Sequence, residues 1–84
     1  MTRWIAVGYG GLLDAERVVA AVRARSAPVK RLLDAAGPDQ IINLTYGYPR
    51  KSVVLLDTGH LALLPLAFDD LLRLLNSEET NDDV

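Results

Sequence analysis

The segment Ser26-Ala27-Pro28-Val29-Lys30-Arg31-Leu32-Leu33 constrains the fold of this 84-residue chain more than any other stretch. Serine caps free amides at helix starts, and a proline in the first turn gives up a donor that has no partner there. The apolar positions that follow have the spacing of one buried helix face; they are Val29, Leu32, Leu33 and Ala36. The segment therefore predicts a helix that begins after Ser26 and ends at Gly37-Pro38.

Short strands are expected on both sides of this helix. Alternating apolar residues bounded by glycine, proline and aspartate predict strands at residues 3–7, 17–22, 40–46, 52–56 and 60–64. Turns are predicted at residues 8–11 and 57–59, and a hairpin loop at residues 47–51. A buried apolar stripe at helical spacing predicts a closing helix over residues 68–75. The expected fold is α+β, a small antiparallel sheet of about five strands with two short helices.

The chain is short and contains no cysteine. A core of this size is marginal, because small domains bury a smaller share of their surface, and neither a disulfide nor a cysteine-bound metal compensates. We therefore expect one domain over residues 1–75 that gains further burial by self-association. Residues 76–84 contain nothing apolar enough to join a core until Val84, and we expect an acidic, disordered tail.

The charge distribution is more informative than the formal net charge of −2. Four of the eleven acidic residues lie in the tail, so seven acids face nine Lys and Arg in residues 1–75, a net charge of +2. No Asp or Glu interrupts the segment from residue 17 to residue 31, which contains Arg17, Arg23, Arg25, Lys30 and Arg31. In a strand of period two, the three arginines from Arg17 to Arg25 share one face and form a row.

These cations predict an anion site. Lys30 and Arg31 run against the dipole of their helix start, where free amides favour phosphate. Arg50 and Lys51 add two cations on the loop at residues 47–51. A solvated basic face, or a pocket for a neighbouring subunit's carboxylate, explains the same cluster. Tyr46 and Tyr48 either stack on a base or serve as a core residue and a loop residue.

Catalysis finds little support in the sequence. The single histidine, His60, follows a turn, where a bond to the turn explains it. Asp69 and Asp70 suit the start of a helix, and Ser26 serves as a cap. We therefore expect that the protein is not an enzyme and that it binds no metal or cofactor. The chain starts without a long apolar stretch, and Asp57, His60 and Pro65 interrupt its most apolar region, so we expect a cytoplasmic protein without membrane contact.

With these residues laid out, the chain resembles the RemA family, small bacterial regulators of extracellular-matrix (biofilm) genes. The likeness runs from about residue 5 to residue 75, and Ser26-Ala27-Pro28-Val29-Lys30-Arg31 is its strongest block. The other matching positions are Val7-Gly8-Tyr9-Gly10, Arg17, Thr45-Tyr46-Gly47, Asp57 and His60. The resemblance implies a DNA-binding transcriptional regulator that assembles into a ring.

In the family, the DNA-contacting arginines lie at the position matched here by Arg17 and in a basic run directly after Thr-Tyr-Gly. This chain departs at the second site, where Tyr48-Pro49 precede Arg50 and Lys51. Our first hypothesis is duplex DNA binding through a basic surface whose main contacts are Arg17, Arg50 and Lys51. Lys30 and Arg31 are either secondary contacts or subunit-interface residues, and Arg23 and Arg25 belong to the same surface. The alternative is an oligomeric scaffold whose cations pair with acids of neighbours or of a protein partner. A third reading is a small-anion or nucleotide sensor at the helix start.

Overall fold

The computed structural model describes the backbone of residues 2–82 and the side chains of residues 2–76. In chain order the elements are β1 (Trp4–Ala6), β2 (Leu12–Asp14), the 3₁₀ helix η1 (Ala15–Arg17), β3 (Val18–Arg23), α1 (Ala27–Ala35), the 3₁₀ helix η2 (Pro38–Gln40), β4 (Ile41–Asn43), β5 (Ser52–Leu56), β6 (Leu61–Leu64) and α2 (Phe68–Asp82). The fold is α+β with two α-helices, as predicted. The described strands form two sheets, of two and four strands, in place of one sheet of about five.

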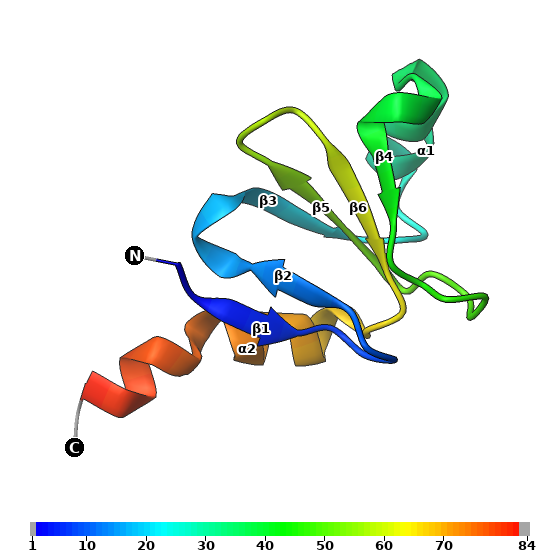
Figure 1. Ribbon diagram of the computed structural model, residues 1–84. Helices are drawn as coiled ribbons and strands as arrows, with labels where there is room; N and C mark the ends of the chain where they lie inside the picture. Colours follow the sequence, from blue (N-terminus) through cyan, green and yellow to red (C-terminus); the bar gives the residue numbers. More distant parts are fainter. Residues whose placement is uncertain (1, 83–84) are drawn as a thin grey trace.

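The larger sheet has the strand order β3-β5-β6-β4 (Figure 1). β3, β5 and β6 pair antiparallel, whereas β4 lies parallel to β6. The predicted hairpin between β4 and β5 is therefore wrong, since β6 lies between these two strands. β3 and β4 run in the same direction at opposite edges of the sheet, and the segment that joins them contains α1, as expected of a crossover between parallel strands.

β1 and β2 form a separate antiparallel hairpin closed by the turn predicted at residues 8–11. The sequence pattern does not predict β2, because Leu12 and Leu13 are adjacent apolar residues and show no alternation. The hairpin directs Ile5 and Leu13 inward, and both are buried. Trp4 and Leu12 lie on its outer face and are 62% and 59% exposed. One side of the hairpin thus extends the core, and the other leaves large apolar side chains at the surface.

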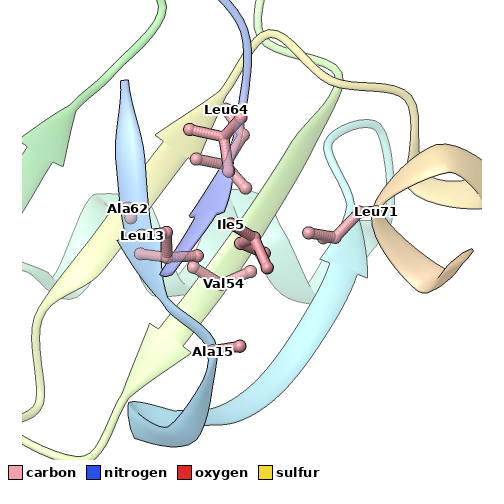
Figure 2. Packing of buried hydrophobic residues seen from close by; sticks show 8 residues of the cluster. Ile5, Leu13, Ala15, Val54, Ala62, Leu64 and Leu71 are labelled. Atoms are coloured by element: carbon pink, nitrogen blue, oxygen red, sulfur yellow. The ribbon is translucent and has the colours of Figure 1, made fainter. Parts of the chain in front are cut away.

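Alternation along β5 and β6 builds a core on each face of the larger sheet. On one face, residues of β5 and β6 pack with the β1–β2 hairpin and α2 (Figure 2); this cluster contains Ile5, Val7, Leu13, Ala15, Val54, Ala62, Leu64 and Leu71. On the other face, Val53, Leu61 and Leu63 pack with Val29 of α1. The β1–β2 hairpin and α2 therefore lie on one side of the sheet and α1 on the other.

Helix α2 continues to Asp82, beyond the predicted end at Leu75. Its inner surface carries Leu71, which is fully buried. The guanidinium of Arg3 donates to the carbonyl oxygens of Leu74 (3.1 Å) and Leu75 (2.9 Å), and so joins the start of the chain to this helix. The division into a domain over residues 1–75 and a separate acidic tail stays a prediction, and residues 83–84 of that tail lie outside the described residues.

Candidate functional site

Two basic segments meet at one end of the β3–β5 pair. Antiparallel pairing sets Arg23, the last residue of β3, opposite Ser52, the first residue of β5. The chain that leaves β3 therefore runs beside the chain that enters β5, and the amide of Ala24 donates to the carbonyl of Lys51 at 3.2 Å. This pairing brings cations that are about 25 positions apart in the sequence to the same edge of the molecule.

Two adjoining cavities lie between these segments. The first, of about 460 Å³, reaches from the turn after β3 to the first turns of α1. The second, of about 400 Å³, reaches from the same turn to Phe68 of α2. Ala24, Arg25 and Arg50 line both. We call the two together the basic groove; its cations are Arg23, Arg25, Lys30, Arg50 and Lys51, and Asp34 of α1 also lines the first cavity.

Most cations of the basic groove have no acidic partner. Arg23 is the exception, since its guanidinium is 3.3 Å from the Asp69 carboxylate and lies over the Phe68 ring at 4.7 Å. Within residues 2–76, no carboxylate lies at ion-pair distance from the other four cations, which are Arg25, Lys30, Arg50 and Lys51. All four are exposed. Cations outnumber acids around this concave surface, and such a surface attracts anions.

Arg17 lies outside the basic groove. It ends η1, before β3, and its guanidinium is 3.6 Å from Asp14 and 3.4 Å from Asp57. A third cavity, of about 320 Å³, surrounds it with Thr2, Asp14, Glu16 and Asp57. At ~3.3 Å per residue, the length of β3 separates Arg17 from the groove by about 20 Å. Arg17 therefore lies at an acidic part of the surface, apart from the other predicted contacts.

The predicted row of three arginines along one strand face is wrong. Arg17 precedes β3 and Arg25 follows it, so only Arg23 belongs to the strand. A register shift between Val18 and Ala20 also breaks the alternation, as a β-bulge does. In consequence Val18 packs toward one core and Val22 toward the other, although period two predicts a shared face.

The helix start at Ser26 is as predicted, but its cap is different. α1 begins at Ala27 with Pro28 in its first turn. The Ser26 hydroxyl donates to the carbonyl of Arg23 at 2.9 Å and makes no side-chain capping bond. Val29 and Leu33 of α1 pack on the sheet, which leaves Lys30 at the first cavity. Arg31 is exposed and lines neither cavity of the groove.

The three tyrosines of the chain lie on two neighbouring turns and are all more than half exposed. Tyr48 stacks on Tyr9, with 3.8 Å between the ring centroids and an interplanar angle of 7°. The sequence pointed only to Tyr46 and Tyr48 as a pair of candidate stacking residues, because both flank Gly47. Sequence reasoning did not identify Tyr9, because its position beside Tyr48 depends on the tertiary fold. It missed Phe68 at the groove for the same reason.

His60 and the acidic residues considered as metal ligands form no binding site among the described residues. His60 bonds within its turn, where its Nδ1 is 2.7 Å from the Thr58 hydroxyl. The described residues hold no group of three or more His, Cys, Asp or Glu arranged for a metal ion. Within the described part of the chain, neither helix has the length and apolar character that a bilayer span needs.

Comparisons with known proteins agree with the resemblance. The family model for extracellular matrix regulatory protein A-like proteins matches residues 4–74. Relatives in Bacillus cytotoxicus, Bacillus mycoides and Bacillus cereus strain B4264, each named "Putative regulatory protein", are 33% identical over 78 residues, which covers 92% of this chain and 90% of each relative. The chain therefore belongs to the RemA-like family of regulatory proteins.

Proposed function

We propose that this protein is a DNA-binding transcriptional regulator of the biofilm-matrix type, and that its basic groove contacts the phosphates of duplex DNA. The observation that carries the proposal is the set of four groove cations without a carboxylate partner among residues 2–76. Lys and Arg side chains that neutralise phosphates release counterions, so binding of this kind weakens steeply with salt. Phosphate contacts position a protein on DNA without reading its sequence.

The spread of these cations favours a polyanion over a single small anion. They come from the turn after β3, from α1 and from the loop before β5, and they line two adjoining cavities. Cations spread in this way contact several phosphates of a DNA strand. A single phosphate group would contact only some of them. The small-anion reading predicts instead that inorganic phosphate or a nucleotide raises the melting temperature.

We further propose that copies of the chain assemble into a ring, so that several grooves engage one duplex. The large apolar side chains on the outer face of the β1–β2 hairpin, Trp4 and Leu12, support self-association. Each protomer supplies only a few phosphate contacts. Linked copies convert later contacts into intramolecular ones, which raises the overall affinity when the geometry allows simultaneous engagement.

A mobility-shift titration with long duplex DNA of mixed sequence tests the proposal, together with size-exclusion chromatography and light scattering on the free protein. We expect an oligomer and a shifted complex at about 50 mM salt that is much weaker at about 200 mM salt. Absence of binding at the lower salt concentration would contradict DNA recognition. A monomer in light scattering would contradict assembly.

The second candidate is an assembly scaffold whose cations bind acids of neighbouring subunits, and the exposed Trp4 and Leu12 also support it. The double variant Lys30→Gln, Arg31→Gln separates the two. The scaffold requires this variant to dissociate the oligomer. DNA recognition requires it to keep the size of the oligomer and to lose affinity for DNA.

We propose Arg17 as a further phosphate contact, outside the basic groove, and here removal of an acid is expected to strengthen DNA binding. Because Asp14 and Asp57 compete with phosphate for its guanidinium, Asp57→Asn is expected to strengthen DNA binding by about 2- to 5-fold, which is the effect of one exposed ion pair. Fluorescence anisotropy with a labelled duplex measures the change. Asp39→Asn is the matched control, since it removes the same charge from the exposed helix η2. Equal gains in both variants would mean that only net charge matters.

A further inference from the structure

Arg50, which lines both cavities of the basic groove, follows Pro49 in a short stretch that contacts with the rest of the fold hold in place on either side. We call these two held points the anchors of the stretch. The anchor on its C-terminal side belongs to the larger sheet. The Lys51 amide donates to the carbonyl of Leu64 at 2.8 Å. The next residue, Ser52, is fully buried, and its hydroxyl donates to the carbonyl of Leu66 at 2.7 Å. The chain direction after Arg50 is therefore fixed by the sheet.

The anchor on the other side is Tyr48. Its amide donates to the carbonyl of Thr45 at 3.0 Å, and its ring stacks on Tyr9. Thr45 is itself buried, with its hydroxyl 2.6 Å from the Asn43 side chain. Among the described residues, no backbone hydrogen bond involves Arg50. Its position thus depends on the two anchors and on the restricted φ of Pro49.

The turn between β1 and β2 presents Tyr9 for this contact. Three consecutive residues have positive φ, which are Gly8 (101°), Tyr9 (53°) and Gly10 (95°). A tyrosine in the left-handed region is uncommon, and the flanking glycines adopt such angles without steric cost. The turn is closed by a bond from the Gly11 amide to the carbonyl of Gly8 at 3.0 Å. A constrained turn on the hairpin therefore supports a ring on the loop at residues 44–51.

We propose that Tyr9 and Tyr48 are positioning residues: their stack holds the segment before Arg50, so that the Arg50 backbone is ordered and presents its side chain at the wall shared by the two cavities before DNA binds. This inference rests on the proposed function of the groove. A loop that is already ordered loses less conformational freedom on binding, and more of the contact energy then appears as affinity. The tyrosines act through Arg50 and make no contact with DNA themselves.

A double-mutant cycle between Tyr48 and Arg50 tests the proposal with a labelled mixed-sequence duplex. Tyr48→Ala is expected to weaken binding by about 2- to 10-fold, the equivalent of one aromatic pair. The slope of log K against log salt is expected to stay that of the wild type, because the variant keeps the charge of Arg50 and only raises the cost of ordering it. Tyr48→Phe is expected to keep the stack, the affinity and the salt slope of the wild type. In the Arg50→Ala background, Tyr48→Ala has no further effect.

The matched control is Tyr46→Ala, which removes an equally exposed ring outside the stack and is expected to leave affinity unchanged. Equal losses from Tyr48→Ala with and without Arg50 would overturn the proposal, because the ring would then touch DNA directly. A Tyr48→Phe variant as weak as Tyr48→Ala would also overturn it, as would unchanged binding in Tyr48→Ala.

A measurement on the free protein separates this proposal from the proposed function. The backbone order parameter of the Arg50 amide, from ¹⁵N relaxation, is expected to lie near ~0.85 in the wild type and to fall below ~0.6 in Tyr48→Ala. If the Arg50 amide stays rigid in the variant, the positioning role is wrong whatever the protein binds. If it becomes mobile while no DNA binding is found in the wild type, the stack orders Arg50 and the function assigned to the groove is wrong.

Discussion

The double variant Arg25→Gln, Arg50→Gln is expected to bind duplex DNA about 10- to 100-fold more weakly than the wild type at low salt. These two arginines line both cavities of the basic groove and have no carboxylate partner among residues 2–76. A hydrogen bond to a charged group contributes about 1.5–3 kcal/mol, and solvent screening reduces this at an exposed surface. Loss of two phosphate contacts also lowers the slope of log K against log salt by about 1.8.

Fluorescence anisotropy over a series of salt concentrations measures both quantities. The matched controls are the single variants Arg50→Gln and Arg73→Gln, which remove the same charge from different places. Arg73 lies on α2, outside the groove, and pairs with Asp70. We expect the Arg50 variant to lose affinity and the Arg73 variant to bind like the wild type. Equal losses in the two single variants would show that net charge, and not the groove, determines binding.

Leu71→Ala is expected to lower the free energy of unfolding by about 3 kcal/mol, within the range of about 2–5 kcal/mol for buried leucines. Leu71 is fully buried and packs in the cluster that joins α2 to the β1–β2 hairpin and the larger sheet (Figure 2). Its removal leaves a cavity where three elements meet. For a domain of this size, a loss of this magnitude is a large part of the total stability.

Urea denaturation at one fixed protein concentration measures the effect, because self-association makes stability depend on concentration. Leu72→Ala provides the control on the same helix. Leu72 is 46% exposed, so its truncation removes less buried apolar surface, and we expect a loss below about 1 kcal/mol. Similar losses in the two variants would mean that α2 packs through a different face.

Local sequence patterns predicted the elements whose signals lie within a few residues. Pro28 and the apolar spacing after it located α1, and alternation with flanking turns located β5 and β6. β2 was missed because Leu12 and Leu13 are adjacent apolar residues without alternation, whereas β1 and β4, which are equally short, lie within longer apolar segments. The parallel pairing of β4 with β6 was missed because neighbouring strands in a sequence usually pair as hairpins, and only tertiary packing placed β6 between β4 and β5.

The sequence predicted which residues belong to the candidate site but not how the fold arranges them. Five of the seven predicted cations line the basic groove, since charge clusters are visible in a sequence. The register between Arg23 and Ser52, which brings those clusters together, has no local signal. The acids around Arg17 come from β2 and from the turn after β5. Asp14 is only three residues away in the sequence, whereas the ion pair with Asp57 depends on the fold. The same holds for the Tyr9–Tyr48 stack.

The most direct test of the central claim is to locate bound DNA on the protein by titrating a ¹⁵N-labelled sample with a short mixed-sequence duplex. If the basic groove holds the phosphates, the largest amide shifts will fall at residues 23–30 and 48–51. Shifts concentrated at residues 4–6 and 12–14 would assign DNA to the outer face of the hairpin instead. That result, or a spectrum unchanged by saturating duplex, would contradict the account.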